Sequence, residues 1–135
     1  MDYVLDACAL IAFLNDEPEA DTVADLLKKV EDGVDRLYIN SIQVLEIYYD
    51  RIYIIGREYA DIFLESLYAS PLIILPEISN DIIREAGRVK TSYSISLADS
   101  IAAATTINLG AVLVTKDDEI KKLEDAGEFS ILWLN

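Results

Sequence analysis

Four acidic residues stand at positions where the chain could assemble a hydrolytic site. Asp6 and Asp117 each follow a short apolar run, whereas Glu46 and Asp99 lie in the early turns of predicted helices. Clustered carboxylates repel one another, and the usual remedy is a hard divalent cation such as Mg²⁺ or Mn²⁺. The chain has no histidine, which excludes a Ser–His–Asp triad and histidine-ligated zinc. Hydrolysis must therefore depend on carboxylates, hydroxyls, lysine or a metal ion.

The stretch 94–119 positions two of these acids and organises the chain. Ser96 predicts a helix N-cap, and Asp99 follows three residues later at the spacing of a capping pair. Gly110 predicts the end of this helix. The apolar run 111–114 then predicts a strand buried on both faces. Asp117 and its acidic neighbours come where this strand should end.

The remaining chain alternates between short apolar runs and amphipathic segments. The runs predict strands at 3–5, 37–39, 72–75 and 129–134, the last of them at an edge. The amphipathic segments predict helices at 7–14 and 18–31, after Asn40 or Ser41, as a hairpin over 51–68 with a break at Gly56, after Ser79, and near 120–123. This alternation predicts an α/β fold with a parallel sheet covered on both faces. We expect a single domain over 1–135.

Sites in such sheets form beyond the carboxyl ends of the strands, so the four acids are expected to converge at one edge. Each also has an ordinary structural interpretation, since Asp6 has the position of a helix N-cap and Glu46 that of a solvated helix residue. Ser41 is a candidate for orienting water or for capping a helix. Lys116 is a candidate for a phosphate contact or a solvated lysine, and Thr115 is a further candidate for supporting the site.

Composition limits the partners and the compartment. Of 135 residues, 53% are hydrophobic, which excludes a disordered chain. The net charge of −14, from 11 basic and 25 acidic residues, repels nucleic acid at long range. A polyanionic substrate would then need metal ions or a local basic patch. The lone Cys8, the lack of a signal-peptide pattern and the lack of a long apolar run predict a cytoplasmic protein without a membrane span.

Four motifs follow one another in a specific order. They are VLDACALIAFLNDEP at 4–18, NSIQVLEI at 40–47, SISLADSIAAAT at 94–105 and AVLVTKDDE at 111–119. In this order and spacing they resemble PIN-domain ribonucleases, and the chain is close in size to the VapC-type toxins of toxin–antitoxin pairs. The chain departs from the family pattern at Cys8, where many relatives carry Ser or Thr. It departs again at Ile120, where many carry an aromatic residue.

The resemblance implies a three-layer fold around a parallel sheet of about five strands. It implies a metal-dependent endoribonuclease that hydrolyses RNA phosphodiester bonds with a 3′-hydroxyl leaving group. It also implies Mg²⁺ or Mn²⁺ as cofactor, an antitoxin protein as partner and a homodimer. The catalytic and metal-binding acids that it implies are Asp6, Glu46, Asp99 and, as the most variable of the four, Asp117.

Other functions compete with this interpretation. A catalytically inactive PIN-like module could use the acids to bind a structural ion or an arginine of a protein partner. A receiver-type phospho-acceptor domain needs an acidic pair near its first strand, but only one acid closes that strand here, and Pro76-Glu77 follows the third. A phosphatase with a nucleophilic Asp needs a second Asp two residues later, where Cys8 stands.

The segment 48–68 is rich in tyrosine on an amphipathic pattern. One interpretation is core packing. The other is an exposed aromatic groove for a helix or strand of a partner, because buried tyrosine hydroxyls need hydrogen-bond partners.

Overall fold

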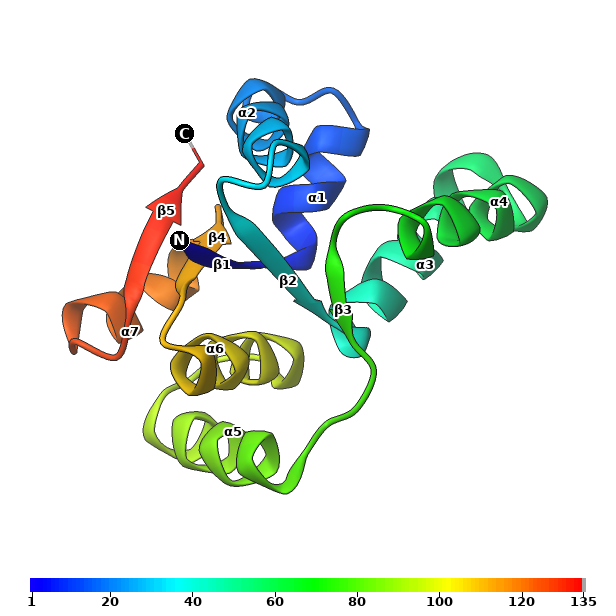
Figure 1. The fold of residues 1–135 in the computed structure, drawn as a ribbon. Coiled ribbons are helices and arrows are strands. Elements are labelled where there is room, and N and C mark those ends of the chain that lie inside the picture. Colours follow the sequence, from blue (N-terminus) through cyan, green and yellow to red (C-terminus); the bar gives the residue numbers. More distant parts are fainter. Residues whose placement is uncertain (135) are drawn as a thin grey trace.

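Five parallel strands form the centre of the computed structural model, which describes residues 1–134 (Figure 1). Their order is β3-β2-β1-β4-β5, so β1 is central and β5 lies at an edge as predicted. The elements are β1 (Asp2–Leu5), α1 (Ala7–Leu14), α2 (Ala20–Glu31), β2 (Arg36–Asn40), α3 (Ser41–Ile55), α4 (Arg57–Tyr68), β3 (Ile73–Leu75), α5 (Asn80–Ser92), α6 (Leu97–Leu109), β4 (Val112–Thr115), the 3₁₀ turn η1 (Asp118–Ile120), α7 (Lys121–Asp125) and β5 (Ser130–Trp133). The predicted α/β fold is confirmed.

Helices cover both faces of the sheet because the strands are apolar at consecutive positions. Leu5 and Leu37 point into a core shared with α1, α2 and α3, whereas Val4 and Leu113 point into a second core shared with α6. The register pairs Val4 with Leu113, so these neighbours lie side by side on one face. All strands run in the same direction, and their carboxyl ends therefore meet at one edge of the sheet.

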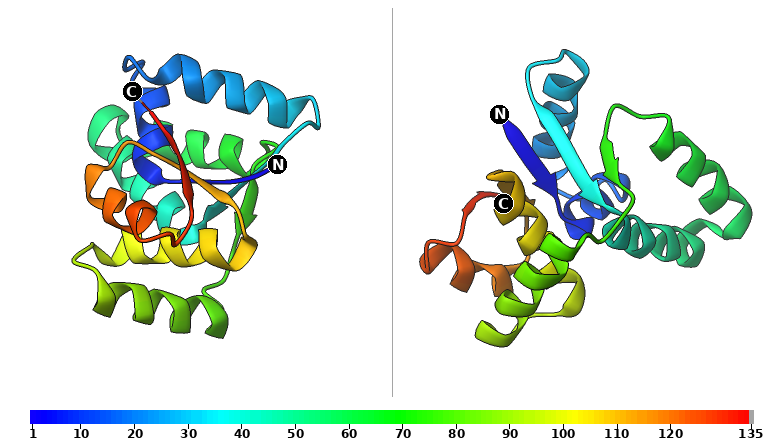
Figure 2. Two further views of the ribbon diagram at one scale, coloured as in Figure 1. Left: turned by 90° about the vertical axis from the view of Figure 1, so that its left-hand side faces the viewer. Right: turned by 60° about the horizontal axis from the view of Figure 1, so that its bottom comes forward.

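Helix α6 lies between the sheet and α5 (Figure 2). Its run of small residues allows contact on every side: Ala102 packs toward the sheet, and Ala104 packs with Ile82 of α5. The N-cap prediction is correct, since Ser96 Oγ accepts a hydrogen bond from the Asp99 backbone N–H at 3.1 Å. Gly110 ends the helix in the left-handed conformation with φ of 60°.

The predicted hairpin turns at Gly56, but its first helix is longer than the sequence suggests. Asn40 caps α3 by accepting from the Ile42 backbone N–H at 3.0 Å, and α3 then continues unbroken to Ile55. Figures 1 and 2 show α3 and α4 projecting from the side of the molecule that carries β3. The hairpin leaves large side chains exposed: Tyr49, Tyr53, Tyr59, Ile62 and Tyr68. The hairpin therefore presents an exposed apolar and aromatic surface in addition to its core residues.

One smaller expectation differs from the structure. Pro18 was expected in the first turn of a helix, but it lies in a turn that precedes α2, where Asp16 has a φ of 53°. At Ile120, where the family pattern favours an aromatic residue, the aliphatic side chain is fully buried in the second core. Across residues 1–134, none of the helices combines the length and apolarity that crossing a bilayer requires.

Candidate active site

Asp6 occupies the centre of the candidate site, directly after the central strand β1. Although it holds the N-cap position of α1, its side chain makes no capping bond. Instead its Oδ2 accepts from the Thr115 hydroxyl at 2.9 Å and from the Cys8 thiol at 3.5 Å. Burial raises the pKa of Asp6, and the charge of Asp117 raises it further, although these two hydrogen bonds act in the opposite direction. Asp6 thus holds the predicted N-cap position, but its carboxylate bonds to Thr115 and Cys8 and does not cap the helix.

Asp99 approaches Asp6 from the first turn of α6. Burial is the largest cause that raises the pKa of Asp99, to about 8, and the charge of Asp6 and the contact with Asp117 add to it. A carboxyl group whose pKa lies this high is held against other negative groups with too little compensation. The site therefore favours an added positive charge.

Asp117 reaches the same place from the end of β4. Its backbone N–H donates to the Thr115 hydroxyl at 3.0 Å, and its own Oδ1 accepts from the Glu119 backbone N–H at 3.0 Å. Thr115, which is fully buried, thus holds both Asp6 and the loop that carries Asp117. Of the three residues predicted to support the site, Thr115 is the one that contacts the acids.

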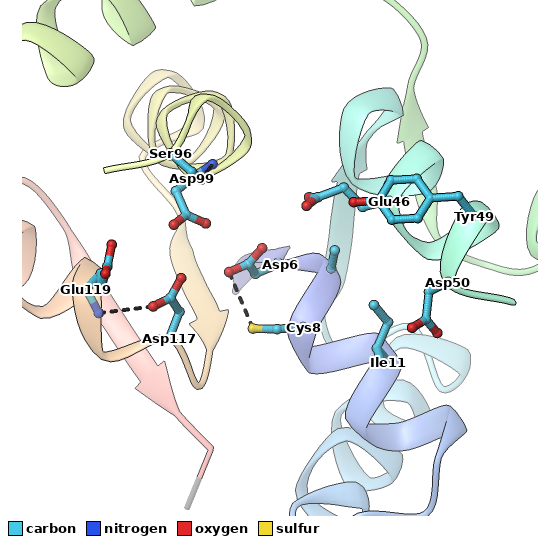
Figure 3. Close-up of a pocket in the computed structure, with 11 residues that line it drawn as sticks. Asp6, Cys8, Ile11, Glu46, Tyr49, Asp50, Ser96, Asp99, Asp117 and Glu119 are labelled. Atoms are coloured by element: carbon cyan, nitrogen blue, oxygen red, sulfur yellow. Dashed lines mark hydrogen bonds between the residues drawn. The ribbon is translucent and has the colours of Figure 1, made fainter. Parts of the chain in front are cut away.

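Glu46 faces these three acids from α3, on the opposite side of the site (Figure 3). Its side chain is half-buried, and burial followed by the charge of Asp6 raises its pKa. The four predicted acids come from four separate elements, and all of them line one cavity of about 520 Å³. Their predicted convergence at the carboxyl edge of the sheet is what the structure shows.

The lining of the cavity is rich in acidic residues. Six of its eleven lining residues carry carboxylates and none of those eleven is basic. Sequence reasoning missed Asp50 as a lining residue, although its position one helical turn after Glu46 places it on the same face of α3. Asp50 pairs with the buried guanidinium of Arg51 at 2.8 Å, and Arg51 also donates to Asn15 Oδ1 at 2.6 Å.

Two of the other predicted residues lie outside the cavity lining. Ser41 donates its hydroxyl to the carbonyl of Leu75 at 2.8 Å, so it connects α3 to β3 and does not orient water in the cavity. Lys116 pairs with Glu17 at 2.8 Å and lies 3.7 Å from Glu19. Its ammonium group is thus held by acidic side chains of the loop between α1 and α2.

The donor atoms suit a hard cation, but they do not form a preorganised ligand set. Within residues 1–134, no three acidic or cysteine side chains form a ready-made set of metal ligands. Cys8 lines the cavity, and burial followed by the charge of Asp6 raises the pKa of its thiol to about 12. Its Sγ lies 3.4 Å from Thr115 Oγ1. Carboxylate oxygens are therefore the available anionic donors, as Mg²⁺ and Mn²⁺ prefer.

Comparison with known proteins agrees with this geometry. Residues 3–126 match the family described as the PIN domain. The chain belongs to the PIN-domain family. No curated protein matches it.

Several solved structures similar to this PIN domain are of VapBC proteins. A chain of VapBC2 from Rickettsia felis, bound to a DNA fragment from their promoter, superposes with a TM-score of 0.77, 20% identity and 100% coverage of both chains. A chain of DNA-bound VapBC from Salmonella typhimurium superposes with a TM-score of 0.74 and 16% identity, and the match covers 100% of this chain and 99% of that one. A chain of VapBC-1 from nontypeable Haemophilus influenzae superposes with a TM-score of 0.72 and 22% identity, and the match covers 99% of this chain and 98% of that one. At these identities the likeness establishes the fold.

Proposed function

We propose that this PIN domain is a metal-dependent endoribonuclease and the toxin of a type II toxin–antitoxin pair. The observation that carries the proposal is the convergence of four carboxylates, from β1, α3, α6 and the end of β4, on one cavity. The family match and the VapBC-like fold support the same conclusion. An inactive PIN-like binding module remains the alternative that the first experiment must separate.

Mg²⁺ or Mn²⁺ is the cofactor that the donor set fits. The proposed ligands are Asp6, Glu46, Asp99 and Asp117. Burial and, after it, the charges of neighbouring acids raise the pKa of Asp99 to about 8 and also raise the pKa values of Asp6 and Glu46. A cation bound there would supply Lewis acidity toward a water and the scissile phosphate.

The residues of the chain then have distinct tasks. Thr115 orients Asp6 and fixes the loop of Asp117 through the two hydrogen bonds to its hydroxyl. We assign acceptance of the proton of the attacking water to Asp99, whose raised pKa makes it a stronger base than an ordinary aspartate. Glu46 closes the opposite side of the cavity (Figure 3). The water oxygen forms a bond to phosphorus, and the phosphodiester bond to the 3′-oxygen breaks, which leaves a 5′-phosphate. The 3′-oxygen takes a proton from solvent water to become a 3′-hydroxyl.

The test is cleavage of a mixed RNA pool by purified protein with Mn²⁺ or Mg²⁺ and with excess EDTA. We expect cleavage that stops in EDTA and is lost in Asp6→Asn and Glu46→Gln. Asp81→Asn is the matched control, because Asp81 is exposed in the first turn of α5 and lies outside the cavity. Equal cleavage in EDTA, or by the two cavity variants, would refute the proposal. Manganese binding without any RNA cleavage would favour the inactive module.

The partner proposed for the α3–α4 hairpin is the antitoxin. Tyr53, Tyr59 and Ile62 are 84%, 64% and 60% exposed, which is unusual for neighbouring large side chains on one hairpin. An amphipathic segment could cover them through spaced apolar contacts. The proposal also includes a homodimer, which sedimentation of the isolated protein would test.

The docking test uses the proposed antitoxin, which we expect a gene next to this one to encode. We expect Tyr59→Ala and Ile62→Ala to weaken its binding in calorimetry. Ile83→Ala serves as control, because Ile83 is 55% exposed but lies on α5. Equal losses for all three variants would argue against the hairpin as the docking surface.

A further inference from the structure

Gln43 connects the two helices that carry acids on opposite sides of the cavity. It is fully buried, and its Nε2 donates to the carbonyl oxygen of Ala98 at 3.0 Å. Ala98 directly precedes Asp99 in α6. In α3, Gln43 lies three residues before Glu46 and therefore on the same helix face. One hydrogen bond thus connects the helix of Glu46 to the helix of Asp99. The side chains of Glu46 and Asp99 face each other across Asp6 in Figure 3.

The buried amide of Gln43 is only partly satisfied by hydrogen bonds. Gln43 Oε1 and the nearby Asn40 Nδ2 are buried without a hydrogen-bond partner among residues 1–134. Exchanging the oxygen and nitrogen positions of either amide would not supply the missing hydrogen bond, because it would break an existing one. Gln43 Nε2 faces a carbonyl acceptor, and Asn40 Oδ1 accepts from the Ile42 backbone N–H. A buried polar atom without a partner costs free energy, which a methionine of similar volume in place of Gln43 would avoid.

We propose that Gln43 is a positioning residue that fixes the separation of Glu46 from Asp99. The inference rests on the proposed function, because this separation matters when one cation must contact carboxylates from both helices. Within residues 1–134 these carboxylates do not form a ready-made ligand set, so cation affinity is sensitive to the distance between α3 and α6. Gln43 itself is outside the cavity lining and acts through the Ala98 carbonyl.

The first experiment compares Mn²⁺ affinity and stability in Gln43→Met. We expect Mn²⁺ affinity, measured by calorimetry, to fall about 10- to 100-fold, as for other residues that orient metal ligands. The urea midpoint in EDTA should stay equal or rise. The control is Thr105→Val. This change removes the buried hydrogen bond from the Thr105 hydroxyl to the Ile101 carbonyl, which lies within α6 and connects no two helices. Unchanged Mn²⁺ affinity in Gln43→Met, or an equal loss in the control, would overturn the inference.

A second experiment needs no metal and separates this inference from the proposed function. Spin labels at Tyr53 of α3 and Asn108 of α6, both exposed, report the distance between the helices in a Cys8→Ser background. We expect one narrow distance distribution with Gln43 and a broader or shifted one with Met. Identical distributions overturn the inference. A parent that binds no Mn²⁺ refutes the proposed ligand set, whereas the label distances still decide whether Gln43 fixes the spacing.

Discussion

Replacing Asp99 by Asn should make the metal-free protein more stable at alkaline pH. In the folded protein the pKa of Asp99 is raised from 3.8 to about 8, mainly by burial and then by the charge of Asp6. The folded state therefore holds this proton more tightly than the unfolded chain. The cost of ionising Asp99 is absent below pH about 4, grows as pH rises, and is complete above pH about 8. The Asn side chain carries no such cost.

The magnitude follows from the size of the shift. Four pKa units correspond to about 5 kcal/mol at most. The cavity opens to solvent and the charge is shared with Asp6, so screening reduces this to about 2 kcal/mol. Loss of a negative charge in the first turn of α6 opposes it by about 0.3–1 kcal/mol. We expect a net gain of roughly 1–2 kcal/mol for Asp99→Asn at pH 8.5 and little or none near pH 4.

Urea unfolding in EDTA at several pH values measures this difference directly. Asp81→Asn is the control, because it makes the same change in the first turn of α5, outside the cavity. Added Mn²⁺ should reverse the order, since a cation that binds the folded state stabilises the parent more. An Asp99→Asn protein less stable than the parent at pH 8.5 in EDTA would show that Asp99 mainly stabilises the helix terminus.

Three further predictions concern the same cavity. Mn²⁺ affinity should rise up to tenfold per pH unit toward pH 8 and then level off, because the Asp99 proton must leave; a flat calorimetric profile would contradict this. Thr115→Val should cost about 1–3 kcal/mol in urea unfolding, because Asp6 loses a buried donor, and more than Thr105→Val, whose hydroxyl bonds only a backbone carbonyl; equal costs would count against it. Cys8, with its pKa near 12, should react with thiol reagents far more slowly at pH 8 than in urea, and reaction at the rate of a free thiol in the folded protein would disprove its protonated state.

Local signals predicted the framework of the site well. Ser96 and Gly110 mark the ends of α6 because capping and left-handed residues act over one helical turn. Alternation of strands and helices also predicted that Asp6 and Asp117 lie at the carboxyl ends of parallel strands. In the structure these two strands, β1 and β4, are neighbours. Such signals depend on residues close in sequence, so they can be recognised without knowledge of the tertiary structure.

Contacts between distant side chains were beyond the same reasoning. Lys116 meets Glu17 because the loop between α1 and α2 passes the end of β4, and nothing near either residue in sequence encodes that approach. Gln43 was missed for a similar reason: its partner, the Ala98 carbonyl, lies 55 residues away. Side chains of this kind acquire their roles from how helices pack, which hydrophobic periodicity describes only coarsely.

The placement of Asp99 shows how packing and proposed chemistry depend on each other in this PIN domain. Helix α6 can lie between the sheet and α5 because its residues are small, and this burial removes water from around its first turn. Removal of water is the largest cause of the raised pKa of Asp99, ahead of the charge of Asp6. A larger residue at Ala102 would push α6 away from the sheet and admit water, which would lower the pKa of Asp99 without touching any acid. The apolar contacts of α6 therefore help to set the electrostatics of the cavity.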